Sequence, residues 1–157
     1  MIEASTMNYS DVDYPAADWN KNLSLNHNRN RGINEMDLQR YWEVTLAQDA
    51  DAMHAFFHRD AYVNWHNTNE HFTVEEFIQA NCEYPGEWDG KLERIEQIDS
   101  LFITVTHVYS ADRELSFHVT SFIRMRDDRI ASIDEYWGDD GSAPQWRLNK
   151  HIGTPIQ

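Results

Sequence analysis

The sequence predicts an α+β fold in which three helices precede a mostly antiparallel sheet. Apolar residues recur at helical spacing in three segments between residues 34 and 83, whereas they alternate every second residue in the segments after residue 90. Helices followed by a run of strands are typical of α+β proteins. The chain of 157 residues is 41% hydrophobic, which suits one domain with one core.

Each of the three helices has a residue suited to begin it. Asn34 can cap the first helix, which ends before the polar stretch "QDAD", and Asp51 can cap a shorter second one. Thr73 and Glu76 have the spacing of a capping box ahead of the third. The apolar residues expected to face the core are Leu38, Tyr41, Trp42 and Leu46, then Met53, Phe56 and Phe57, then Phe77, Ile78 and Cys82.

Five segments are predicted to be strands. A short one, "AYVNWHN", lies between the second and third helices, and the turn "YPGEWDG" follows the third helix. Short turn-like stretches then separate four strands, which is the pattern of an antiparallel meander. These strands cover residues 91–98, 101–110, 114–126 and 130–137.

Composition divides the chain into a polar N-terminal extension (1–33), a folded domain (34–138) and a C-terminal tail (139–157). The Asn-rich extension has neither a helical nor a strand period, so it is either flexible or attached through a few apolar side chains to the domain or to a partner chain. Those side chains would be Tyr14, Trp19, Leu23 and Leu25.

The net charge of −14 argues against nucleic acid and anionic membranes as partners, because their phosphates would be repelled. No apolar run is long enough to span a membrane, and the first residues lack the features of a signal peptide. Cys82 is the only cysteine, which excludes an internal disulfide. We therefore expect a cytoplasmic protein.

Three stretches carry a family resemblance: "LQRYWEVTLAQDADAMHAFFHRDAYVNWHN", "TVEEFI" and "SFIRMRDDRIASIDEYWGD". Their order and local pattern resemble the nuclear-transport-factor-2-like (NTF2-like) superfamily, in its SnoaL-like and ketosteroid-isomerase-like branch. The resemblance implies a cone-shaped sheet wrapped around the helices, an internal pocket and a homodimer formed through the outer face of the sheet. The fold hosts isomerases, dehydratases, hydrolases, cyclases and non-catalytic proteins, so the chemistry stays open.

The same resemblance suggests roles for single residues. Tyr41 stands where ketosteroid isomerases have a tyrosine that donates a hydrogen bond to the oxyanion. Trp65 and Ser121 stand where those isomerases have their two aspartates, so steroid isomerisation is not expected. Glu135 stands where related epoxide hydrolases carry an acid in the pocket.

Alternation along the strands predicts which side chains face the pocket. In residues 101–110 the apolar face begins at Leu101 and would carry His107 and Tyr109 inward. In residues 115–125 the face containing Val119 and Ser121 points inward, which turns His118 outward; a β-bulge would reverse either assignment downstream of it.

In residues 130–137, Ile133 and Glu135 share a face, so Glu135 should point inward and Asp134 outward. Burial should raise the pKa of Glu135 unless a protonated His107 lies close to it. The predicted catalytic residues are Glu135, His107 and Tyr41, and the predicted ligand contacts are Trp65, His66, Trp137, Ser121, Tyr109 and Val119. A structural role for His107 and Glu135 remains the alternative.

No metal or cofactor is expected. The stretch "HNTNEH" (66–71) differs by one residue from the zinc pattern H-x-x-E-H and precedes a helix instead of lying on one. The stretch "DDGSAPQWR" lacks the ligand pattern of a calcium loop and is interpreted as a turn.

Two functions of different class fit these observations. The first is a cofactor-independent lyase, isomerase or hydrolase that acts on a small aromatic or polycyclic molecule, with Glu135 or His107 as base and Tyr41 as donor. The second is a non-catalytic protein that binds a small organic ligand in the same pocket. In both cases we expect a homodimer.

Overall fold

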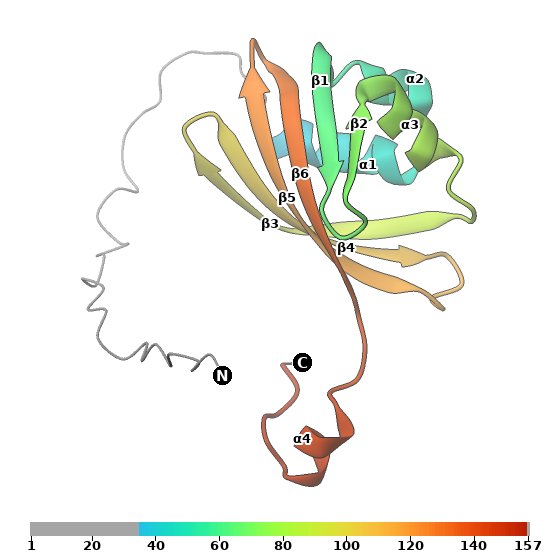
Figure 1. Ribbon diagram of the computed structural model, residues 1–157, viewed down its shortest axis with the longest axis vertical. Coiled ribbons are helices and arrows are strands. Elements are labelled where there is room, and N and C mark those ends of the chain that lie inside the picture. The colour runs from blue at the N-terminus through green and yellow to red at the C-terminus, as the bar shows by residue number, and fades with distance from the viewer. Residues whose placement is uncertain (1–34, 157) are drawn as a thin grey trace, which may run out of the picture. The chain divides into compact units, whose positions relative to one another are not determined.

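The computed structural model describes residues 35–156, and Figure 1 shows their arrangement. The predicted cap at Asn34 and the predicted extension 1–33, with its four apolar anchors, lie outside the described residues. The division of the chain into extension, domain and tail therefore stays a prediction.

Three helices precede the main part of the sheet, as predicted: α1 (Glu35–Leu46), α2 (Ala50–His54) and α3 (Val74–Cys82). The capping box of α3 is confirmed, since Thr73 accepts from the Glu76 N–H and Glu76 accepts from the Thr73 N–H. The predicted cap of α2 is wrong by two residues: Asp49, not Asp51, accepts from the Ala52 N–H. A short helix, α4 (Gln145–Asn149), occupies part of the stretch interpreted as a turn.

Six strands form one curved sheet, and the α+β cone is confirmed. The strands are β1 (Phe57–Trp65), β2 (Glu70–Thr73), β3 (Trp88–Ile98), β4 (Leu101–Ser110), β5 (Ser116–Arg126) and β6 (Arg129–Asp139). Their order is β2-β1-β6-β5-β4-β3; β1 and β6 are parallel and the other pairs are antiparallel. Strand β2, which pairs only with β1, was not predicted.

Irregular pairing accompanies the curvature of the sheet. The register shifts between Leu92 and Arg94 in β3, and between Arg124 and Met125 in β5. Such bulges bend a strand and increase its twist. The sheet therefore has a concave inner face toward the helices and a convex outer face.

The core lies between α1, α3 and the inner face. Its fully buried side chains include Leu38, Tyr41, Val63, Val119, Ile123 and Ile133. Three other members of this core, Trp42, Phe77 and Val108, also border the cavity described below.

One row of paired residues crosses four neighbouring strands. Thr104 on β4 pairs with Ser121 on β5, Ser121 pairs with Glu135 on β6, and Glu135 pairs with Trp65 on β1. Residues directly opposite each other in a sheet point to the same face. The row therefore brings Ser121, Glu135 and Trp65 together on the inner face.

Within residues 35–156, no helix has the length and apolarity that a membrane span requires.

Candidate functional site

A cavity of about 450 Å³ opens between the helices and the inner face of the sheet, a size typical of sites for small organic ligands. Helices α1 and α3, strands β1, β3, β4, β5 and β6, and the turn after β1 all contribute to it. Its lining residues are Trp42, Thr45, Leu46, Gln48, Trp65, Asn67, Thr68, Phe77, Asn81, Tyr84, Trp88, Val108, Phe117, Glu135, Trp137 and Asp139.

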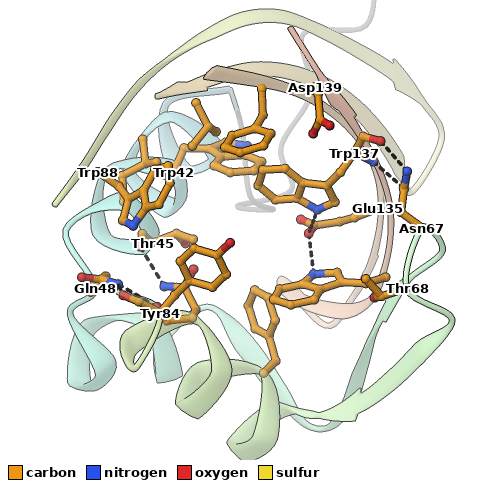
Figure 2. A pocket seen from close by; sticks show the side chains of 16 residues that line it. Trp42, Thr45, Gln48, Asn67, Thr68, Tyr84, Trp88, Glu135, Trp137 and Asp139 are labelled. Atoms are coloured by element: carbon orange, nitrogen blue, oxygen red, sulfur yellow. Dashed lines mark hydrogen bonds between the residues drawn. The ribbon is translucent and has the colours of Figure 1, made fainter. Parts of the chain in front are cut away.

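Aromatic rings dominate the wall of the cavity. Tyr84, Trp88, Phe117 and Trp137 form a continuous series of ring contacts, with centroids 5.5, 6.1 and 6.3 Å apart. Figure 2 shows Trp42 and Trp88 across the cavity from Trp137 and Glu135. The cavity is thus a largely apolar space with a carboxyl group on one side.

Glu135 is the central polar group of the site. Its Oε2 accepts hydrogen bonds from the indole N–H of Trp65 (2.8 Å) and from that of Trp137 (3.0 Å), and its Oε1 accepts one from the Ser121 hydroxyl (3.2 Å). Sheet geometry explains this convergence, because Trp65 and Ser121 are its neighbours on the adjacent strands and Trp137 lies two residues along β6.

Burial sets the protonation behaviour of Glu135. Its exposed fraction is 2%, and the loss of hydration raises its pKa to about 7, although the hydrogen bonds from Trp137, Ser121 and Trp65 oppose the rise. Both the acid and the carboxylate are therefore populated near neutral pH. The predicted inward position and raised pKa agree with the structure.

Side-chain amides hold the wall in place. The Asn67 side-chain amide accepts from the backbone N–H of Trp137 (2.7 Å) and donates to the backbone carbonyl of the same residue. These two bonds fix β6 next to the turn after β1. On the other side, the Gln48 amide donates to the carbonyls of Asn81 and Tyr84, at 2.8 Å each. Both amides bind backbone and so orient the aromatic residues that they hold.

Tyr41 lies beneath the cavity, in the core. Its side chain is fully buried and contacts Trp42, Phe56 and Phe57 edge to face, and its hydroxyl has no hydrogen-bond partner among the described residues. Burial raises the pKa of Tyr41, and the negative charge of Glu135 raises it further. Tyr41 is thus electrostatically coupled to Glu135 without lining the cavity.

The prediction that His107 and Tyr109 point into the pocket is wrong. The buried residues of β4 are Phe102, Thr104, Thr106, Val108 and Ser110, so His107 and Tyr109 lie on the outer face. Tyr109 there contacts Asp89 and Arg113.

The error has a physical cause. Both faces of β4 are rich in apolar residues: the outer one carries half-buried Leu101, Ile103 and Val105, while two threonines interrupt the inner one. Hydrophobicity therefore indicated the wrong inner face for β4. The pairing of β4 with β5 gives the right one: His107 lies directly opposite His118, which was correctly predicted to point outward, so His107 points outward too.

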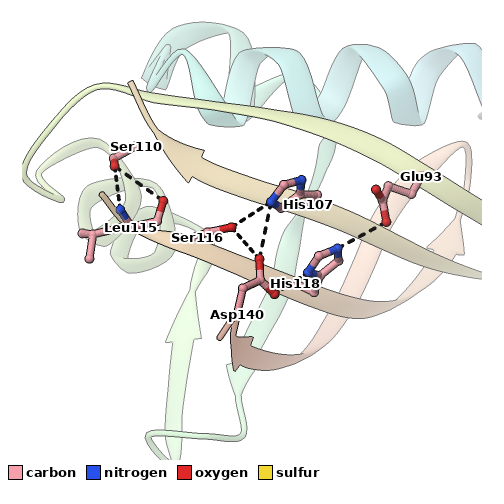
Figure 3. A network of polar contacts seen from close by, with 7 residues as sticks. All are labelled: Glu93, His107, Ser110, Leu115, Ser116, His118 and Asp140. Atoms are coloured by element: carbon pink, nitrogen blue, oxygen red, sulfur yellow. Dashed lines mark hydrogen bonds and ion pairs between the residues drawn. The ribbon is translucent and has the colours of Figure 1, made fainter. Parts of the chain in front are cut away.

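The two histidines belong to a polar network on the outer face (Figure 3). Their rings stack with centroids 4.6 Å apart. His107 Nε2 lies 2.8 Å from the Ser116 hydroxyl, and His118 contacts Asp140 through Nδ1 (2.5 Å) and Glu93 through Nε2 (3.3 Å). Glu93, His107 and His118 offer ligand atoms within 4.8 Å of one another and could hold a metal ion, but they lie apart from the cavity.

Three further predicted contacts do not line the cavity either. His66 is exposed, stacks on Tyr136 and contacts the outward-facing Asp134 at 2.8 Å. Val119 is buried in the core. Ser121 is also buried, and its hydroxyl donates to the Glu135 carboxyl without reaching the cavity. Only Trp65, Trp137 and Glu135 of the nine predicted residues line the space directly.

Sequence reasoning missed several lining residues, chiefly Tyr84, Trp88, Phe117 and Asp139. Tyr84 and Trp88 belong to the stretch interpreted as a turn, of which Trp88 begins β3. The signal available in the sequence was the inward parity of Phe117 and the even spacing of Glu135, Trp137 and Asp139 along one strand face.

A family model for the SnoaL-like domain matches residues 38–133, which is most of the described chain. The chain belongs to this SnoaL-like family. None of the curated protein sequences matches it significantly.

Solved structures similar to this SnoaL-like protein share its fold at low sequence identity. An NTF2-like protein of unknown function from Burkholderia xenovorans LB400 has a TM-score of 0.64 at 21% identity, over 76% of this chain and 92% of its own. A protein with a ketosteroid isomerase-like fold from Catenulispora acidiphila, solved in complex with trimethylamine, has a TM-score of 0.56 at 11% identity, covering 66% and 86%. An LEH-like epoxide hydrolase of M. tuberculosis has a TM-score of 0.54 at 13% identity, covering 64% and 79%.

Proposed function

We propose that this SnoaL-like protein binds a small organic molecule in the cavity and that Glu135 transfers a proton in a cofactor-independent lyase, isomerase or hydrolase reaction. The observation that carries the proposal is the buried Glu135 carboxyl at the wall of an aromatic cavity, with a pKa of about 7. A group that titrates near the working pH can both accept and return a proton.

The surroundings of Glu135 suit such a role. In the carboxylate form it removes a proton from the bound molecule, while the two indole N–H groups keep its Oε2 in one position. In the acid form it returns the proton to the product. Tyr41, the donor predicted from the sequence, lies beneath the cavity without lining it, so its part in the proposal is limited to its electrostatic coupling to Glu135.

The structural neighbours support a small-molecule function in general terms. One is solved with trimethylamine and another is an epoxide hydrolase, so the fold accommodates both ligand binding and catalysis. His107 has no part in the proposal, because it lies on the outer face.

Non-catalytic binding is the second candidate. One observation favours it: Tyr84, Glu135 and Asp139 are the only titratable side chains among the described residues that line the cavity, and Glu135 alone of these is buried. Among the described lining residues, no second buried titratable side chain is available to relay a proton.

The first experiment identifies the ligand. Purified full-length protein would be denatured and its small-molecule content determined by mass spectrometry, and the compounds found would be tested for turnover. Glu135→Gln would abolish turnover with binding retained if Glu135 transfers the proton, whereas binding without turnover in the wild type would support the second candidate. Absence of any ligand, together with failure of small organic molecules to bind, would overturn both.

The homodimer and the cytoplasmic location also remain proposals. The half-buried apolar residues on the outer face of β4 and β5 support the dimer, because the helices cover only the inner face.

A further inference from the structure

The charges at the cavity have one sign. Two acidic residues, Glu135 and Asp139, line it, whereas none of its described lining residues is a lysine, arginine or histidine. The whole chain carries a net charge of −14. An anionic ligand would therefore meet repulsion both on approach and inside the cavity.

Glu135 lacks a cationic partner in the described part of the chain. Its three hydrogen-bond donors are two indoles and a hydroxyl, all uncharged, and they stabilise the carboxylate without cancelling its charge. A buried carboxylate is costly unless it is protonated or paired with a cation. A positive group in the cavity would complete this site.

The aromatic wall of the cavity provides a second feature, besides the Glu135 carboxylate, that favours a bound cation. Four of the six tryptophans of the chain line the cavity, joined by Phe77, Tyr84 and Phe117. The faces of aromatic rings carry negative electrostatic potential, and indole attracts cations most strongly. Trp42 and Trp88 lie across the cavity from Glu135 and Trp137, so a bound molecule is enclosed between rings and a carboxylate (Figure 2).

We propose that the ligand of this cavity is an organic cation: a substituted ammonium with an apolar or aromatic group attached. The rings hold the alkylated nitrogen and Glu135 balances its charge, while the volume of about 450 Å³ admits a small organic molecule. The inference rests on the proposed function, namely that the cavity binds a small molecule, and it applies to catalysis and to simple binding alike. A neutral apolar ligand beside protonated Glu135 is the competing occupant.

The test compares two probes of the same shape that differ in charge: (3-hydroxyphenyl)trimethylammonium and its neutral isostere 3-tert-butylphenol. Binding to the full-length chain would be measured by calorimetry and tryptophan fluorescence at pH 8, where Glu135 is mostly ionised. We expect the cation to bind at least about tenfold more tightly than the isostere.

Three variants locate the effect. Glu135→Gln should reduce the preference for the cation to less than about threefold while the isostere keeps its affinity. Trp88→Leu leaves the carboxylate untouched; it should lower the affinity for the cation about fivefold and the affinity for the isostere less. This variant also keeps the test decisive if Glu135→Gln does not fold. Trp146→Leu is the matched control, because Trp146 is 59% exposed in α4 and does not line the cavity.

The outcomes separate the inference from the proposed function. Equal or tighter binding of the neutral isostere would overturn the inference and leave the proposed small-molecule function standing. A cation preference that persists in both Glu135→Gln and Trp88→Leu would also overturn it, because the preference would then arise elsewhere. Failure of both probes to bind the folded protein would count against the inference and against the proposed function together.

Discussion

The indole N–H of Trp65 donates a 2.8 Å hydrogen bond to Oε2 of Glu135, the residue directly opposite it in the parallel pairing of β1 and β6. Ser121 on β5, the residue opposite Glu135 on its other side, donates to Oε1. The polar centre of the cavity is therefore the Glu135 carboxyl on β6, held by donors from the two neighbouring strands.

The pH dependence of stability should report the burial of Glu135. Its pKa is raised from 4.5 to about 7 on folding, so the folded state binds more protons than the unfolded state between these values. Stability from this group is complete below pH 4.5 and is lost as the pH rises through 7, by roughly 3 kcal/mol. Urea unfolding at pH 5 and pH 8 should show that decrease in the wild type and a smaller one in Glu135→Gln. An unchanged difference in the variant would contradict the assignment.

Removal of an indole donor should raise the pKa of Glu135 further. Trp137→Phe and Trp65→Phe each keep a ring and lose the N–H that stabilises the carboxylate. NMR titration of the carboxyl carbon should give higher values in both variants than in the wild type, with Trp137→Phe the larger change. Trp88→Phe is the control, since its N–H donates to the Pro85 carbonyl and should leave Glu135 unaffected.

The pKa of His118 should depend on its hydrogen bond with Asp140 in the outer-face network. The hydrogen bond and charge of Asp140, with Glu93, hold the pKa of His118 above 6.5, despite opposition from partial burial. Its stabilising contribution is present below pH 6.5 and is lost as the pH rises through the raised value. Asp140→Asn should lower the pKa of His118 in a proton NMR titration, and Glu93→Gln should lower it less. No decrease in either variant would show that the ring is not paired in solution.

The cap of α3 should contribute measurable stability. Thr73→Ala removes the side chain that accepts from the Glu76 N–H, and such losses cost about 1 kcal/mol. Chemical unfolding would measure this decrease. Thr73→Ser keeps the hydroxyl and should recover most of it, and equal losses in the two variants would argue against a capping role.

Assembly through the outer face should depend on its apolar residues. Ile103→Arg introduces a charge on the outer face of β4, where Ile103 is half-buried, and should convert a dimer to a monomer in light scattering. Ile152→Arg, the same change at a residue that is 54% exposed in the tail, should leave the mass unchanged. A wild-type mass matching 18.5 kDa would refute the dimer directly.

Local sequence signals determined the framework of this protein. The capping box at Thr73 and Glu76 marked the start of α3, because both halves of that motif lie within one turn. Ile133 and Glu135 share a face of that stretch, and "EYW" resembles the acid-bearing stretch of the epoxide hydrolases; together these two signals predicted that Glu135 faces inward. The order of helices and the antiparallel meander followed from the same short-range patterns.

Only the tertiary structure decided which face of β4 points inward and which rings surround the cavity. Leu101 and Phe102 are both apolar, so the alternation in β4 had no unique solution until pairing placed His107 opposite His118 and Val108 opposite Phe117. Trp88 reaches the cavity because β3 curves past the end of α1, a consequence of bends and pairing over the whole sheet. Face and curvature depend on contacts between distant segments, and the free energy of those contacts is not encoded in any single stretch of sequence.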